Sequence, residues 1–254
     1  MHKPLTKTQI AIVNGQSIFQ YKVKSVSKGM GKTEKALKTS TNKKLGKIVK
    51  KGRLRGAKIY TLTLEERKTC PISCEFYKKQ KGGCYGNNMH LATRYIVDES
   101  LMIEIENNLA EYSLKGKPFL VRLHVLGDFS SLDYVNFWES MLNKYPLLNV
   151  YGYTAHHRDT DIGYSLECLR VIHDKRFMVR VSGDFGSETM TALSFDNPCS
   201  LPMVQAKEAF VCPTQITKKG EYKLASKNET TLTPDCGTCG LCWTVDKPVV
   251  FLTH

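Results

Sequence analysis

The sequence predicts an α/β protein, with a parallel sheet or an incomplete (β/α) barrel and a cysteine-rich, metal-binding C-terminal extension. Three observations lead to this prediction. Short runs rich in β-branched residues alternate with longer segments whose apolar residues recur at helical spacing. Each strand and its helix together take about 35 residues or fewer, as in βαβ units. Cysteines gather at the start of this region and again near the C-terminus.

The elements can be placed in order along the chain. Residues 10–26 suggest a short hairpin around Asn14-Gly15, and residues 27–56 suggest an exposed linker or a loosely helical arm. Strands are expected over 57–65, 118–127, 147–155 and 175–183. Helices are expected over 88–114, 130–145 and 162–174. Beyond residue 183 the sequence suggests irregular structure.

Charge is distributed unevenly along the chain. Residues 1–60 hold 16 of the 37 Lys and Arg but only one of the 24 acidic residues, Glu34. We therefore expect three parts: a basic N-terminal arm (1–56), an α/β core with a cysteine loop (57–198) and a cysteine-rich metal-binding segment (199–254). Such a basic arm favours nucleic acid as a partner. The alternative is a solvated arm that only aids solubility.

The chain holds nine cysteines. It has no apolar run long enough to span a membrane and no secretory signal, so we expect a cytoplasmic protein without a membrane partner. Thiols stay reduced in that compartment. An odd number of clustered cysteines there favours metal or iron–sulfur ligation over disulfides.

The C-terminal cysteines have the more specific spacing. Cys236, Cys239 and Cys242 follow a C-x2-C-x2-C pattern, which turns successive thiolates toward one centre. The fourth ligand would be Cys212 or His254. Four thiolates leave zinc and an iron–sulfur cluster both open, whereas His254 as a ligand favours zinc.

The other three cysteines of interest lie directly after the first expected strand. Cys70, Cys74 and Cys84 have no obvious fourth ligand nearby, which is typical of a centre with one open coordination position. A structural zinc with a distant ligand such as His90 is the alternative. The amide of Asn87 could bind a ligand or close a turn.

Polar residues also follow the other expected strands. Gly127-Asp128 ends the second, Thr154 the third and Gly183-Asp184 the fourth. In parallel sheets such residues meet at the carboxyl edge, where active sites form. Each Asp could instead cap the helix that follows it.

These motifs resemble a phage-associated family called gene product eighty-eight. The likeness covers residues 43–254 and includes "TLTLEERKTCPISC", "CYGNN", "VRLHVLGDFSSLDYV" and "CGTCGLCW". Members occur in phages and prophage-bearing bacteria, which implies a host-cytoplasmic location.

The chain more distantly resembles radical S-adenosylmethionine enzymes. That resemblance implies a [4Fe–4S] cluster on Cys70, Cys74 and Cys84, and a second cluster on the C-terminal cysteines. It implies cofactor contacts from Gly127, Asp128, Thr154, Arg180 and Ser182, to which Asn87 is added as a candidate. The nine residues between Cys74 and Cys84 and the Asp at 128 depart from the usual motif of those enzymes.

Two other functions stay open. The chain also resembles base-exchanging transglycosylases, which implies Asp128 and Asp184 as catalytic pair and zinc on Cys236, Cys239, Cys242 and His254. A non-enzymatic nucleic-acid-binding protein with two structural metal sites is the third hypothesis. We expect a phage-type iron–sulfur enzyme of radical S-adenosylmethionine character, acting on or near nucleic acid.

Overall fold

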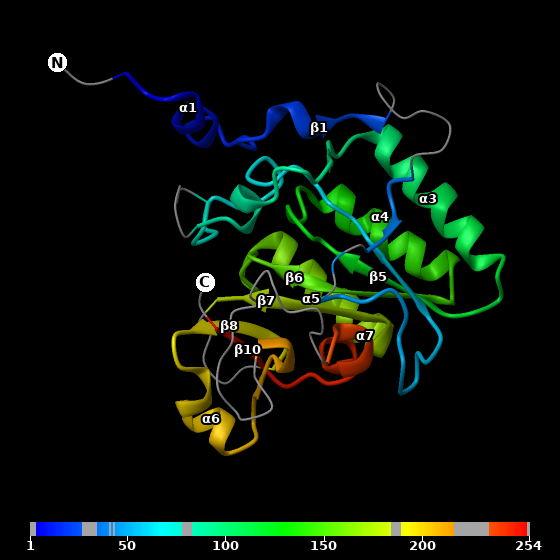
Figure 1. Cartoon of the computed structure of the whole chain (residues 1–254). Helices are drawn as coiled ribbons and strands as arrows, with labels where there is room; N and C mark the ends of the chain where they lie inside the picture. The colour runs from blue at the N-terminus through cyan, green and yellow to red at the C-terminus, as the bar shows by residue number, and fades with distance from the viewer. Residues whose placement is uncertain are drawn as a thin grey trace.

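The centre of the molecule is an eight-stranded, mostly parallel sheet (Figure 1). The computed structural model describes residues 4–26, 35–40, 42, 44–77, 83–183, 189–215 and 234–252. Across the sheet the strands are β2 (Lys38–Thr39), β3 (Lys58–Thr61), β5 (Phe119–Leu123), β6 (Leu148–Thr154), β7 (Phe177–Ser182), β8 (Thr191–Phe195), β10 (Val249–Leu252) and β9 (Phe210–Val211). Only the pair β2–β3 is antiparallel.

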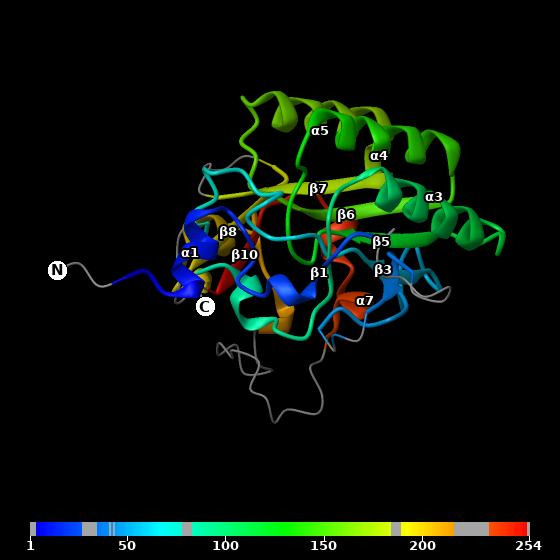
Figure 2. The same cartoon turned by 90° about the horizontal axis from the view of Figure 1, so that it is seen from above.

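Three long helices connect the central strands and lie on one face of the sheet (Figure 2). They are α3 (Glu99–Ser113), α4 (Leu132–Lys144) and α5 (Asp161–His173). Each begins after a side chain that accepts a backbone hydrogen bond from the first turn, namely Asp98, Ser131 and Thr160. Because β3, β5, β6 and β7 are adjacent in chain order, the connections between them all cross on the same side.

Short elements complete the described part of the chain. The other helices are α1 (Lys7–Val13), α6 (Pro202–Gln205) and α7 (Cys236–Cys239). Single 3-10 turns span Gln20–Lys22, Tyr85–Asn88, Asp174–Arg176, Pro198–Ser200, Pro213–Gln215 and Leu241–Trp243. Strands β1 (Val23–Lys24) and β4 (Arg94–Tyr95) pair in a separate two-stranded sheet. No helix in these ranges is both long and apolar enough to serve as a transmembrane span.

Alternation along the strands divides the core in two. On the helix-covered face, Val121, Val150 and Phe177 pack with side chains of α3, α4 and α5. On the opposite face, Leu120, Tyr151 and neighbouring side chains pack with the C-terminal segment around Trp243. Among the described residues, this second face has no long helix and is covered by α7 and the turn that follows it (Figure 2).

The α/β prediction and its parallel sheet are confirmed. The structure contains a strand within each of 57–65, 118–127, 147–155 and 175–183. Within the described ranges the sheet is open, with β2 and β9 at its edges, so it does not form a closed barrel. The expectation of irregular structure beyond residue 183 was wrong, because β8, β9 and β10 extend the same sheet.

Three local predictions were also wrong. The hairpin over 10–26 is replaced in part by helix α1, because Thr6 and Gln9 form a capping box. The helix expected over 88–114 begins only at Glu99, and the buried Tyr95 lies in β4. Residues 44–56 with β2 are not an exposed linker: Leu37, Leu45 and Val49 are buried, and β2 pairs with β3.

Candidate functional site

The segment after β3 is held by buried charged residues. Arg94 Nε donates to Glu66 Oε2 at 2.7 Å, and both side chains are at most 1% exposed. Arg94 also donates to the carbonyl oxygens of Gly86, Met89 and Ala92. A methyl group at Gly86 would lie 2.8 Å from the Glu66 carboxyl carbon. The far end of the cysteine loop thus closes tightly over this ion pair.

A second buried arginine ties the two parts of the loop together. Arg67 donates from Nε to the carbonyl oxygen of Tyr77 and from Nη2 to Asn87 Oδ1 at 2.7 Å. The Asn87 amide therefore helps to close the loop, the role that its position in a turn suggested.

The cysteine loop begins beside Asp128, whose N–H donates to Thr69 Oγ1 at 3.1 Å. Burial raises the pKa of Cys70 most, and Asp128, Cys74 and Cys84 raise it further. Burial likewise raises the pKa of Cys74 and of Cys84. Cys70, at the start of this loop, and the second-strand aspartate therefore follow β3 and β5 at neighbouring positions.

Asp128 is 3% exposed and its carboxylate is held by backbone groups. Oδ1 accepts from the N–H of Phe129 at 2.8 Å and Oδ2 from the N–H of Ala155 at 2.7 Å. Burial raises the pKa of Asp128, while His156 and these hydrogen bonds oppose that rise. The Ala155 contact joins the ends of β5 and β6, so this aspartate does not cap a helix; Ser131 caps α4 instead.

The predicted residues Thr154, Ser182 and Arg180 do not all lie at the same place. Thr154 is buried beside Asp128, whose pKa its hydroxyl lowers, and accepts from the N–H of His156 at 3.1 Å. Ser182, at the end of β7, is partly exposed. Arg180 lies elsewhere. It is fully buried on the sheet face opposite α3, α4 and α5, and it donates to the carbonyl oxygens of Lys247, at 2.7 Å, and Val245.

The C-terminal cysteines lie on the same face of the sheet as Arg180, opposite α3, α4 and α5. Asp235 caps α7, and Gly240 ends it with φ +72°. Cys242 Sγ lies 3.2 Å from the Tyr153 hydroxyl of β6. Burial raises the pKa of Cys236 to about 12, and Cys242 and Cys212 contribute to that rise. Cys212 also raises the pKa of Cys239 and of Cys242.

Two predicted residues, Asp184 and His254, lie outside the described residues. Among the residues that the structure does describe, no three Cys, His, Asp or Glu side chains form a group that could hold a metal ion.

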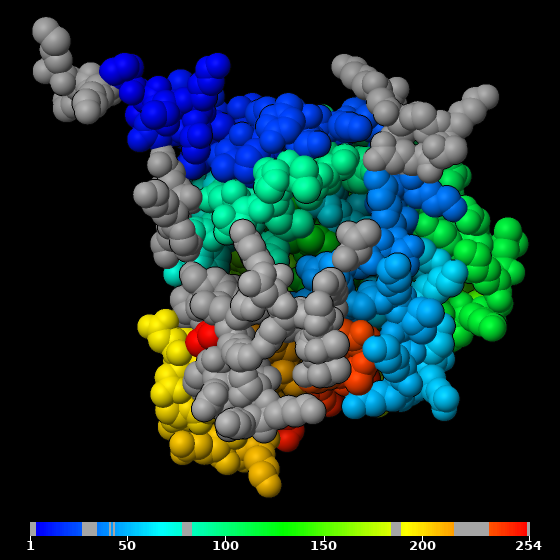
Figure 3. All heavy atoms as spheres, in the orientation of Figure 1, coloured from blue at the N-terminus to red at the C-terminus, as the bar shows by residue number. Residues whose placement is uncertain are grey.

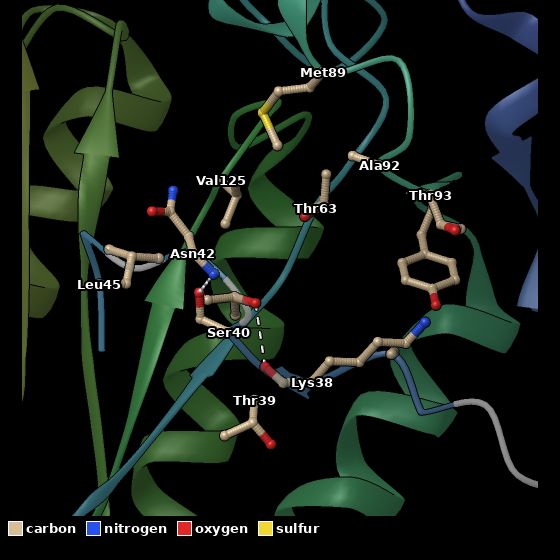
Figure 4. A pocket seen from close by; sticks show the side chains of 13 residues that line it. Lys38, Thr39, Ser40, Asn42, Leu45, Thr63, Met89, Ala92, Thr93 and Val125 are labelled. Carbon is tan, nitrogen blue, oxygen red and sulfur yellow. Dashed lines mark hydrogen bonds between the residues drawn. The ribbon is translucent and has the colours of Figure 1, made fainter. Parts of the chain in front are cut away.

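A pocket of about 230 Å³ opens beside the strand ends (Figure 4). Its walls come from β2, the end of β3, the segment 89–95 and Val125, which precedes Gly127 by two residues. Hydroxyl groups and apolar side chains share the lining.

Sequence reasoning missed one feature of the sheet face opposite α3, α4 and α5. Arg122 of β5 lies over the rings of Tyr151 and Tyr153, with its guanidinium carbon 5.7 and 5.0 Å from their centroids. The signal was present, since period-two alternation places Arg122 on the face opposite Val121 and Leu123.

Comparison of the chain with protein-family models, curated proteins and solved structures finds no match.

Proposed function

We propose that the chain is an iron–sulfur enzyme of the radical S-adenosylmethionine type. The observation that carries this proposal is the position of Asp128, whose N–H donates to Thr69 Oγ1 at 3.1 Å, so that this carboxylate lies beside the start of the cysteine loop. The three thiols of that loop together with this carboxylate would form a donor set that suits a cluster with one open iron.

Different residues would bind the cluster, the cofactor and the substrate. Cys70, Cys74 and Cys84 would hold the cluster, which supplies an electron for reductive cleavage of S-adenosylmethionine. Asp128, oriented by the N–H groups of Phe129 and Ala155, would accept hydrogen bonds from the cofactor's amine. Burial in this dry setting strengthens such contacts. The pocket beside Val125 would receive the rest of the ligand or the substrate.

A cluster fits the thiols better than a single ion does. One zinc ion needs every sulfur within about 2.3 Å of the metal. The thiolates of a cluster bind different irons and can lie further apart.

Metal analysis tests the proposal directly. Anaerobically purified protein should be brown and contain iron and sulfide. Cys70→Ala should lose about half the iron if two centres are present, whereas Cys168→Ala, a cysteine on α5 away from both groups, should retain it. Unchanged iron in Cys70→Ala would reject the loop centre, and a colourless protein with one zinc would favour the transglycosylase or binding hypothesis.

We also propose that the exposed basic side chains of residues 47–58 contact nucleic acid. Lys47, Lys51, Arg55 and Lys58 are exposed along this segment. Replacing Lys47, Lys51 and Arg55 by Glu should weaken DNA binding and reduce its dependence on salt, because fewer counterions are released. Lys207→Glu, at the opposite edge of the sheet, is the matched control. Equal affinities would reject this role.

A further inference from the structure

The outward face of α5 carries exposed apolar side chains. Tyr164, Val171 and Ile172 are 67%, 83% and 62% exposed. Their spacing of seven and eight residues, with the partly exposed Cys168 between them, places all four on one side of the helix. Leu166 packs into the core from the other side. We call Tyr164, Cys168, Val171 and Ile172 the α5 stripe.

The neighbouring helix α4 has an outward face of the usual polar kind. After its first turn, the exposed residues of α4 are Asn136, Ser140, Asn143 and Lys144. Single exposed apolar residues are common on protein surfaces, but a row of them along one helix is typical of an interaction site. Figure 2 shows α5 on the outer side of the helix layer and α7 on the other side of the sheet. A partner could therefore bind the α5 stripe without covering the C-terminal cysteines.

The two ends of the α5 stripe differ in charge. Asp159 and Asp161 are both exposed at the N-terminal end of the helix. At the C-terminal end, Asp174 and Lys175 are exposed and Arg176 is half-buried, so that one acid stands beside two bases. The surface is thus complementary to a copy of itself turned end to end.

We infer that the α5 stripe is a dimer interface in which α5 packs antiparallel against α5 of a second copy. A two-fold interface brings the same surface of both copies together. With the axis beside Cys168, Tyr164 lies opposite Ile172 of the second copy, since each is four residues from that cysteine. Asp161 lies opposite Lys175 of the second copy, since each is seven residues from it. The negative end of each helix dipole then meets the positive end of the other.

A parallel pairing is disfavoured by the same charges, because it would place Asp161 of one copy beside Asp161 of the other. The antiparallel dimer depends neither on the proposed iron–sulfur centre nor on the proposed reaction. One pair of helices buries less surface than a standard protein–protein interface, so we expect a weak dimer that forms as the protein concentration rises.

Sedimentation equilibrium over a range of protein concentrations tests the pairing. Val171→Lys should raise the dissociation constant at least about tenfold, because the dimer would bury an ammonium group without a counter-charge. Asn143→Lys adds the same charge near the C-terminal end of α4 and should leave the dissociation constant unchanged. A parent protein that stays monomeric at every concentration would overturn the inference in favour of a different protein partner. Equal constants in the parent and Val171→Lys would also overturn it.

Charge reversal tests the antiparallel arrangement. Asp161→Lys should raise the dissociation constant several-fold, because it places two lysines opposite each other, and Lys175→Asp should do the same with two aspartates. The double variant Asp161→Lys/Lys175→Asp restores opposite charges at both ends. Its dissociation constant should return to within about twofold of the parent's. If neither single variant weakens the dimer, or if the double variant does not recover, the inferred interface is wrong.

Discussion

Gly127 shows how one residue allows the ends of β3 and β5 to approach each other. Its φ is +80°, and an added Cβ would lie 2.5 Å from Thr69 Oγ1 and 2.6 Å from Leu64 Cβ. Thr69 cannot easily move away, because its hydroxyl donates to the carbonyl oxygen of Glu65 and accepts from the N–H of Asp128. The glycine thus sets both the backbone turn and the position of the adjacent carboxylate.

Gly127→Ala should therefore destabilise the protein more than an alanine at an open glycine. Gly52 has a similar φ of +75°, and an added Cβ there would meet nothing within 4 Å, so Gly52→Ala measures the conformational cost alone, about 1–2 kcal/mol. The clash at Gly127 should add about 1–3 kcal/mol to the loss of unfolding free energy in urea. Equal losses in the two variants would show that the contact with Thr69 and Leu64 is not limiting.

His124 predicts a pH dependence of stability. It is 4% exposed, and burial, followed by Arg122, lowers its pKa from 6.5 to about 3. Between these values the unfolded chain binds a proton that the folded chain does not. Stability should therefore fall as pH drops from about 6.5 toward 3, at up to about 1.4 kcal/mol per pH unit.

Urea unfolding at several pH values isolates this effect by comparing variants. His124→Asn should show a shallower loss of stability below pH 6.5, whereas a variant of the exposed His90 should keep the parent's slope. A slope unchanged by His124→Asn would mean that other groups carry the acid sensitivity.

The conformation of the cysteine loop, which contains Cys70, Cys74 and Cys84, depends on contacts with residues distant in the sequence. The Glu66 carboxylate that receives Arg94 also accepts from the Ser17 hydroxyl at 2.7 Å. One ion pair thus connects the N-terminal segment, the start of the loop and β4. The loop should lose its shape when this pair is broken.

Glu66→Gln should cost about 3–5 kcal/mol of unfolding free energy, because it leaves Arg94 buried without its counter-charge. The matched control is Glu106→Gln, which breaks the pair with Lys144, whose side chain is 58% exposed, and should change the unfolding free energy far less. Chemical denaturation measures both. A small loss in Glu66→Gln would mean that the loop is held by its backbone contacts instead.

Only some of the strands and helices could be predicted from the sequence. Strands β3, β5, β6 and β7 and helices α4 and α5 were predictable because their apolar residues follow one period over many residues. Strands β8, β9 and β10 were not, since their form depends on pairing with one another and with β7 within the sheet. Tyr95 fits a helical spacing but lies in β4, where tertiary contacts override the local pattern.

The candidate site was predictable to a similar degree. Strand ends at one edge of a parallel sheet must meet, so the approach of Asp128 to the segment that holds Cys70 follows from topology. Arg180 follows the same strand logic but faces away, because successive residues of a strand point to opposite faces of the sheet. Which face a polar residue takes depends on the packing of distant segments, and this the sequence does not show.

For the whole molecule, the C-terminal segment is part of the main fold. Backbone N–H groups of Lys50 and Cys236 donate to the carbonyl oxygens of Gly237 and Lys44, which joins α7 to residues 44–50. In Figure 3 the orange and red C-terminal atoms lie directly against blue atoms of this N-terminal region. Strand β10 lies between β8 and β9 within the large sheet. We therefore expect the segment to unfold together with the core.

The two tryptophans of the chain make this expectation measurable. Trp138 is buried in α4 on the helix-covered face, and Trp243 is buried under the opposite face beside Tyr151. In Trp138→Phe the remaining fluorescence reports the C-terminal segment, and in Trp243→Phe it reports the helical core. In each variant the fluorescence and far-ultraviolet circular dichroism should change at the same urea concentration, as a two-state transition requires. If Trp243 fluorescence changed first in Trp138→Phe, the C-terminal segment would be a separately stable unit attached to the core.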